Sequence, residues 1–383
     1  MKPNHVLPGE PDTGPPRLTR LAELSALGQS VWIDFLSRDL IESGGLARAV
    51  QDDAVVGVTS NPSIFGKALS QGSSYDDQIE SSIGDLVSVY HALAMRDVAA
   101  ACDVMRPVWE RTGGRDGYVS IKVDPNLAAD THGSIAQATQ FHETIARPNL
   151  LVKIPATDAG VPAIEEMTAR GYSINVTLIF SLERHRQVAD AYLRGLERLI
   201  AVDGDPALVH SVASFFVSRV DSETDRRLAA HGRDDLRGQL AIANANLAYQ
   251  QYKELFAGAR WQVLAARGAT TQRCLWASTS TKDPSYRDTL YVDELIGPET
   301  ITTMPAETIA AFQDHGRVES RLASDLKAAH QVFRELHAAG VDYDDVVATL
   351  EREGIEKFDA AFDELLKGIA DKRAVRTPAS SHR

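Results

Sequence analysis

The sequence predicts an α/β fold, a single (β/α)8 TIM barrel with extra terminal helices. Eight short runs rich in β-branched and aromatic residues alternate with stretches of helical periodicity, which favours parallel strands joined by crossover helices. One run alternates between polar and apolar residues, and several others end in polar or charged residues. Polar residues at strand ends are typical of the active-site end of such a barrel.

The predicted strands follow one another along the whole chain. They lie at residues 31–34, 54–59, 118–123, 150–154, 173–177, 209–214, 274–278 and 300–304. Helical periodicity is clearest at residues 238–256 and 319–339, and Gly340 suits the left-handed position that ends a helix. Asn61 and Pro62 suit a helix start, with asparagine as the cap. Three more helices are expected after the eighth strand, running to about residue 370.

Length and composition are those of a soluble globular protein. The chain has 383 residues, of which 44% are hydrophobic and 24% charged, and one barrel can span that length. Residues 1–17 are rich in proline, glycine and charge, so we expect a disordered arm there. The barrel should occupy residues 18–370, and residues 371–383 should form a flexible tail.

Charge and hydropathy exclude several classes of partner. The net charge of −13 argues against nucleic acid, and no apolar run is long enough to cross a membrane. The first residues lack the apolar region of a secretory signal. Only Cys102 and Cys274 are present and no CxxC pair occurs, so we expect no disulfide framework and a cytoplasmic location.

Residues 173–178 carry the most informative local pattern. The polar side chains are Ser173, Asn175 and Thr177, and the residues between them are apolar. A doubly wound sheet buries both faces of its strands and favours continuous apolar runs. A barrel instead lets the apolar face meet the helices while the polar face lines the interior. The alternation therefore favours a barrel with a polar interior at this strand.

Lys153 is the strongest catalytic candidate from the residues themselves. It lies in the apolar strand NLLVKIP, where loss of water would lower the pKa of its amine and free it as a nucleophile. Attack on a carbonyl would give a Schiff base that can withdraw electrons during carbon–carbon cleavage. The alternative is a lysine that extends to solvent from the strand end. Polar residues at the other strand ends, including Asp34, Lys122, Thr177 and Arg219, favour the catalytic interpretation.

Six motifs together resemble the transaldolase family, most closely its actinobacterial type. They are WIDFLSRD, VGVTSNPSIF, VKIPAT, INVTLIFS, SVASFFVSRVD and LWASTSTKDP, in the family's order, and the resemblance covers about residues 18–370. It implies a class I aldolase barrel with the reactive lysine on the fourth strand, which VKIPAT places at Lys153. It also implies that Asp34 transfers protons and orients the substrate, and that Thr177 positions a catalytic water.

The resemblance also implies a set of substrate contacts. Asn61 and Asn175 correspond to amides that bind the donor's hydroxyls, and Ser214 and Arg219 to the hydroxyl and phosphate contacts. Ser278 and Lys282 are expected to complete the phosphate site. Arginine suits phosphate because it can form two parallel hydrogen bonds. No metal and no cofactor are expected, because the iminium withdraws the electrons and no metal-binding motif occurs.

One position departs from the family. The third strand of its members reads like VSIEVD, and that glutamate is the general acid/base that acts through the catalytic water. Here residues 119–124 read VSIKVD, so Lys122 replaces the acid and should point inward toward Lys153. A positioned acid/base group contributes ~10²–10⁴-fold in rate, so Lys122 puts ordinary turnover in question. Asp124 shares the face of Lys122 but should lie too far along the strand to substitute.

Three interpretations stay open from the sequence. The protein could be a transaldolase that transfers a dihydroxyacetone unit between sugar phosphates. It could be a recruited relative that applies Schiff-base chemistry to another substrate in secondary metabolism, or a catalytically silent barrel that only binds a ligand. The expected partner is a small sugar phosphate or related keto compound, with no nucleic acid and no membrane. A homodimer is allowed but not indicated.

Overall fold

The barrel predicted from the sequence is present. The computed structural model describes residues 18–60 and 62–376. Eight parallel strands close into one barrel, each paired with the next along the chain and the last with the first. The strands are β1 (Gln29–Ile33), β2 (Val55–Thr59), β3 (Tyr118–Lys122), β4 (Leu150–Pro155), β5 (Ile174–Ile179), β6 (Ser211–Phe216), β7 (Arg273–Ala277) and β8 (Thr300–Met304). Each predicted strand is confirmed, with ends displaced by two residues at most.

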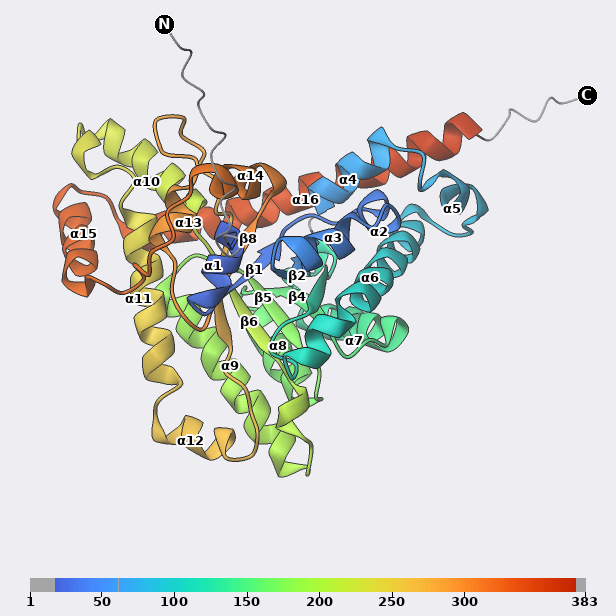
Figure 1. The fold of residues 1–383 in the computed structure, drawn as a ribbon, viewed down its shortest axis with the longest axis horizontal. Coiled ribbons are helices and arrows are strands. Elements are labelled where there is room, and N and C mark those ends of the chain that lie inside the picture. The colour runs from blue at the N-terminus through green and yellow to red at the C-terminus, as the bar shows by residue number, and fades with distance from the viewer. Residues whose placement is uncertain (1–17, 61, 377–383) are drawn as a thin grey trace, which may run out of the picture.

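Helices surround this barrel and cover its carboxyl end (Figure 1). They are α1 (Arg20–Ala26), α2 (Arg38–Glu42), α3 (Gly45–Asp52), α4 (Pro62–Gln71), α5 (Asp76–Ser81), α6 (Leu86–Arg111), α7 (Thr131–Ile145), α8 (Gly160–Ala169), α9 (Leu182–Ala201), α10 (Ser218–Ala230), α11 (Leu240–Leu255), α12 (Ala259–Ala265), α13 (Leu290–Glu294), α14 (Ala306–His315), α15 (Leu326–Ala338) and α16 (Tyr343–Arg376). Single turns of 3₁₀ helix lie at Pro125–Leu127, Pro206–Leu208 and Asp234–Leu236. The three helices expected after the eighth strand are α14, α15 and α16.

Two helix boundaries differ from the prediction. The helix expected at 319–339 begins only at Leu326, because Ala323 has a left-handed φ of 58° and the Asp325 carboxylate caps the backbone N–H of Ala328 at 2.9 Å. Its predicted end is confirmed, since Gly340 has a φ of 79°.

The last helix continues beyond the expected boundary at residue 370. Residues 371–376 belong to α16, so this part of the expected flexible tail is helical. Lys372 forms an ion pair with Asp76 at 2.6 Å, and Arg373 donates to the carbonyls of Ser82 and Gly84. These bonds hold the last turns against the loop after α5. The expected N-terminal arm at residues 1–17 and the end of the tail lie outside the described residues.

Polar groups close the amino end of the barrel. Arg273 at the start of β7 forms a buried ion pair with Asp116, with 2.9 Å between Nη2 and Oδ1. Ser30 Oγ donates to the same carboxylate at 2.8 Å and accepts from Arg273 at 2.9 Å. The indole of Trp32 also donates to Asp116. A layer of apolar side chains lies inside the barrel above this network and separates it from the carboxyl end.

Helix α16 crosses the carboxyl end of the barrel and covers it. It packs against α10 on one side and α4, α5 and α6 on the other, and also contacts β5 (Figure 1). Gly354 lets it approach closely, because a Cβ at this position would lie 3.0 Å from Leu178 Cδ2. Leu178 itself has a left-handed φ of 60°, which is costly for a leucine. This residue interrupts the β5–β6 register directly after Thr177.

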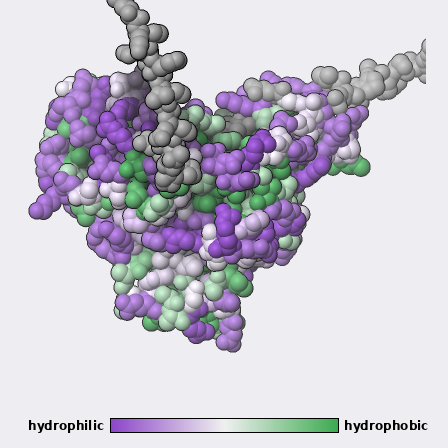
Figure 2. Space-filling model, in the orientation of Figure 1, coloured by the Kyte–Doolittle hydropathy of each residue, from purple (hydrophilic) through white to green (hydrophobic). Residues whose placement is uncertain are grey.

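The face of the molecule drawn in Figure 2 is mainly hydrophilic with scattered apolar side chains. Single exposed hydrophobic residues such as Ile83 and Val202 need no special explanation. In the part of the chain that the structure describes, no helix combines the length and apolar character needed to span a membrane.

Candidate active site

The candidate site lies at the carboxyl ends of the strands, under α16. Pairing places Lys122, Lys153 and Asn175 level with one another on β3, β4 and β5. Paired residues on parallel strands share a face, so these three side chains point to the barrel interior together. The sequence prediction that Lys122 points toward Lys153 agrees with this register.

Lys153 is held with its amine near a carbonyl and a carboxylate. Its Nζ lies 3.4 Å from the backbone oxygen of Ser60, the residue that follows β2. Burial lowers the pKa of Lys153 to about 8, and the negative charge of Asp34 opposes this effect. An amine with this pKa is partly neutral near physiological pH, as a nucleophile requires.

Asp34 follows β1 and forms the acidic partner of this lysine. Burial raises the pKa of its carboxyl to about 6, while Lys153 favours the charged form. Its Oδ1 is buried and has no hydrogen-bond partner among the described residues. A carboxyl group with a pKa near the operating pH can both donate and accept a proton.

A hydrogen-bonded row of side chains lines the interior beside the two lysines. Ser214 Oγ donates to Asn175 Oδ1 at 2.7 Å, and Asn175 Nδ2 donates to Ser120 Oγ at 3.0 Å. All three residues are almost fully buried. This row fixes the orientation of the Asn175 amide and of the Ser214 hydroxyl.

Thr177 is the next residue after Asn175 on the same face of β5, and it is fully buried. Within residues 18–60 and 62–376 its Oγ1 finds no hydrogen-bond partner. A buried hydroxyl without a partner costs about 1–3 kcal/mol, so a water molecule or a substrate is the natural occupant of this position.

Lys122 contacts helix α16, which covers the site. The side chain is 6% exposed, and its Nζ lies 2.9 Å from the ring centroid of Phe358 in α16. It forms no hydrogen bond or ion pair with any residue that the structure describes. Burial lowers the pKa of Lys122 well below its ordinary value, and the charges of Lys153 and Arg219 act in the same direction. Asp124 cannot compensate from this strand, because His91 and Gln137 bind its carboxylate at 2.8–3.1 Å.

Arg219 lies in the first turn of α10 and faces the same space. Its guanidinium carbon is 5.1 Å from the ring centroid of Phe216 and 5.9 Å from that of Phe358. Burial lowers the pKa of Arg219. Its Nη1 is buried and unpartnered in the described part of the chain, which leaves a donor available for an anion.

Ser278 and Lys282, the two residues expected to complete a phosphate site, differ in how near they lie to Arg219. Ser278 follows β7 with a left-handed φ of 58°, and its hydroxyl lies 2.9 Å from that of Ser218, the residue before Arg219. Lys282 is exposed, and its Nζ donates to Ser280 at 2.7 Å. Asn61, the remaining predicted contact, lies outside the described residues, as does its predicted role as a helix cap.

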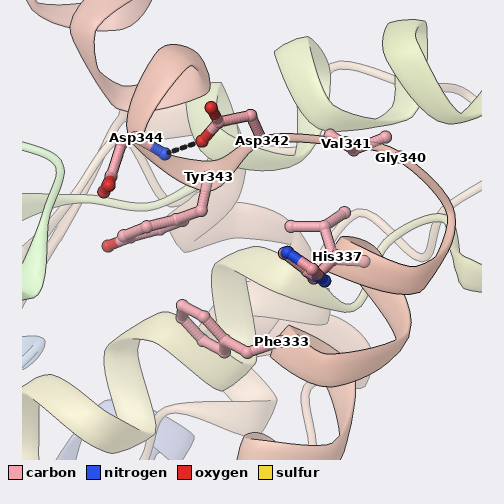
Figure 3. Close-up of a pocket in the computed structure, with 8 residues that line it drawn as sticks. Phe333, His337, Gly340, Val341, Asp342, Tyr343 and Asp344 are labelled. Atoms are coloured by element: carbon pink, nitrogen blue, oxygen red, sulfur yellow. Dashed lines mark hydrogen bonds between the residues drawn. The ribbon is translucent and has the colours of Figure 1, made fainter.

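Two surface cavities lie away from the strand ends. One, between α10 and the loop after β7, includes Lys282 in its lining. The other, of about 470 Å³, lies where α15 joins α16, and Phe333, His337 and Tyr343 line it (Figure 3). None of the predicted site residues belongs to its lining. Over the described ranges, no group of three histidine, cysteine or acidic residues is placed to hold a metal ion.

Sequence reasoning missed Phe358, whose ring lies against both Lys122 and Arg219. It belongs to a long helix far from every motif, where an aromatic residue ordinarily predicts packing. Nothing in the local sequence pairs it with β3.

Comparisons with known proteins agree with the motifs. The transaldolase/fructose-6-phosphate aldolase family matches residues 31–369. The chain is 52% identical to transaldolase 1 of Streptomyces avermitilis over 91% of its own length and 94% of that protein. It is 52% identical to a transaldolase of Saccharopolyspora erythraea, covering 92% and 98% of the two chains, and 49% identical to transaldolase 2 of Streptomyces coelicolor, covering 91% and 95%. The chain therefore belongs to the transaldolase/fructose-6-phosphate aldolase family.

Proposed function

We propose that this protein is a transaldolase that moves a dihydroxyacetone unit between sugar phosphates through a Schiff base on Lys153. The observation that carries the proposal is the Lys153 amine, whose pKa burial lowers to about 8 beside a carboxyl of pKa about 6. These two values give a nucleophile and a proton-transfer group that both work near neutral pH. The names of relatives about half identical to this chain support the same reaction.

The other side chains have roles that follow from their chemistry. Asp34 takes and returns the proton of the substrate hydroxyl next to the bond that breaks. Thr177 holds the water that leaves and re-enters at the Schiff-base carbon, which suits its unpartnered buried hydroxyl. Asn61, Asn175 and Ser214 bind the hydroxyls of the donor.

Arg219 offers a buried Nη1 that has no hydrogen-bond partner among the described residues, which suits a phosphate-binding group. We propose that Arg219 binds the phosphate, with Ser278 close by and Lys282 completing the charge after a movement of its exposed side chain. The net charge of −13 supports a small-molecule substrate rather than nucleic acid. We also propose a cytoplasmic location for the protein.

A second candidate is a recruited relative that keeps the Schiff base but accepts another substrate. Lys122 favours it, because this buried amine stands at the carboxyl end of β3, where the resemblance to the family implies a glutamate. Such a substrate would carry a different charge from that of the usual sugar phosphate on the part that lies beside Lys122.

Trapping with borohydride tests the proposal. Fructose 6-phosphate and borohydride should add one reduced donor unit to the peptide that contains Lys153, and Lys153→Met should abolish this adduct. A coupled assay with fructose 6-phosphate and erythrose 4-phosphate should show transfer. An adduct without transfer would favour the recruited relative, and no adduct with any keto sugar would refute the Schiff-base assignment.

A further inference from the structure

Two buried lysines on neighbouring strands point into the same part of the barrel interior. Lys122 and Lys153 are paired across neighbouring strands and share a face, and such strands lie ~5 Å apart. The charge of Asp34 acts on the amine of Lys153, and that of Asp359 acts on the amine of Lys122. Two positive charges this close and this buried would repel strongly, so the pair favours holding a single proton.

The surroundings decide where that proton resides. Burial and the positive charges of Lys153 and Arg219 favour the neutral form of Lys122, and only Asp359 on α16 opposes them. Lys153 retains the proton more readily, because Asp34 stabilises its charged form. These surroundings therefore favour a charged Lys153 beside a neutral Lys122, and a neutral buried amine is a proton acceptor.

We propose that Lys122 is a catalytic residue that carries the proton from the nitrogen of Lys153 to the departing oxygen during Schiff-base formation. This inference rests on the proposed function of Lys153. Lys122 here performs the transfer with an amine, in the position where the family uses a carboxylate.

The steps balance without any other reactant. The ammonium of Lys153 gives a proton to Lys122, and the neutral Lys153 amine then forms a bond to the carbonyl carbon. A proton moves from the new nitrogen to the oxygen, which yields a carbinolamine. The ammonium of Lys122 then gives its proton to the carbinolamine hydroxyl, the carbon–oxygen bond breaks, and water leaves. The products are the iminium on Lys153 and neutral Lys122, so one positive charge is present throughout.

Phe358 is the positioning residue for this transfer. Its ring covers the Lys122 amine at 2.9 Å from the centroid, which keeps bulk water from one side of the nitrogen and can interact favourably with the ammonium when it forms. The ring also lies 5.9 Å from the guanidinium carbon of Arg219. The close approach of α16 at Gly354 holds this ring over the barrel mouth.

Lys122→Met tests the proposal, because methionine has an unbranched side chain only one atom shorter than that of lysine and has no amine. The measurement is the rate at which fructose 6-phosphate becomes trappable by borohydride on Lys153 in a single turnover. We expect this rate to fall by ~10²-fold or more. Lys253→Met is the matched control, since Lys253 also lies over an aromatic ring, that of Tyr249, but is exposed on α11. Its trapping rate should equal that of the unmodified protein.

Rescue by a free amine separates chemistry from packing. Lys122→Ala leaves space that ethylamine can enter, whereas Lys122→Met fills it. Ethylamine should therefore raise the trapping rate of Lys122→Ala by about tenfold or more in a saturable manner, and leave Lys122→Met unchanged. Circular dichroism should show that both variants are folded, since removal of a buried amine that forms no ion pair with the described residues should not unfold the barrel.

The outcomes distinguish this inference from the proposed function. If the unmodified protein traps the sugar on Lys153 and folded Lys122→Met does so equally fast, Lys122 carries no proton and only this inference fails. A folded Lys122→Ala protein that ethylamine does not rescue would refute it as well. An unmodified protein that forms no adduct on Lys153 would instead overturn the proposed function, and this inference with it.

Discussion

Changing Lys122 to glutamate should move the pH dependence of Schiff-base formation upward. The new carboxylate would lie across neighbouring strands from Lys153, at the spacing of ~5 Å between strands. At an effective dielectric constant of about 20, two opposite charges at this distance attract by about 3 kcal/mol. Because about 1.4 kcal/mol corresponds to one pH unit, the charged form of Lys153 should persist about two pH units higher than before.

The consequence is a loss of free amine at moderate pH. With a pKa of about 8, roughly half of the Lys153 side chains are neutral at pH 8. After the substitution only about 1% would be neutral at that pH. Imine formation by Lys122→Glu should therefore reach its plateau only well above pH 9, although the new acid/base group could then support transfer.

The assay is the single-turnover trapping rate with fructose 6-phosphate between pH 6 and pH 10. Lys122→Gln is the matched control, because it has the size of glutamate but no charge and should not raise the midpoint by this amount. A midpoint for folded Lys122→Glu that stays at or below that of the unmodified protein would show that the two side chains do not interact as their register implies.

Three further predictions concern other parts of the molecule. Arg219→Ala should raise KM for fructose 6-phosphate far more than for fructose, and an equal effect on both would remove its phosphate role. Asp116→Ala should lower the free energy of unfolding by about 3–5 kcal/mol in urea titrations, because it leaves Arg273 buried without its partner. Arg115→Ala, which breaks an exposed ion pair, should cost less than about 1 kcal/mol, and similar losses for both would contradict the argument. In kcat/KM profiles the activity should fall as the pH drops through about 6, where Asp34 gains a proton, and Asp34→Asn should abolish this limb if the group is correctly assigned.

Local sequence patterns were sufficient for much of the fold. Every strand was predicted within two residues of its position, because strand periodicity and turn residues are local properties. The boundary of α15 was wrong because the cap at Asp325 replaces an apparently continuous helical pattern. The end of α16 was wrong because bonds to Ser82 and Gly84, far away in the chain, hold its last turns.

The site could be assembled only in part from the sequence. Motif matches named Lys153, Asp34 and Arg219, and the parity of β3 and β4 placed Lys122 on the inner face. Motifs could not reveal how Lys282 is oriented, since its amine donates to Ser280 on an exposed loop. The orientation of such a side chain depends on neighbours that have no fixed spacing in the sequence.

The sequence by itself determined the order of the strands, the polar face of β5 and the place of Lys122 on the inner face of β3. Only the tertiary structure decided what surrounds that lysine. From the sequence alone, Lys122 is an ordinary positive charge near a strand end. In the folded protein it is buried under Phe358 and has Lys153 and Arg219 as neighbours, so its neutral form is favoured. The physical reason is that the protonation of a buried amine depends on loss of water and on charges close in space. Here the charges come from β4 and α10 and the covering ring from α16, three separate segments of the chain.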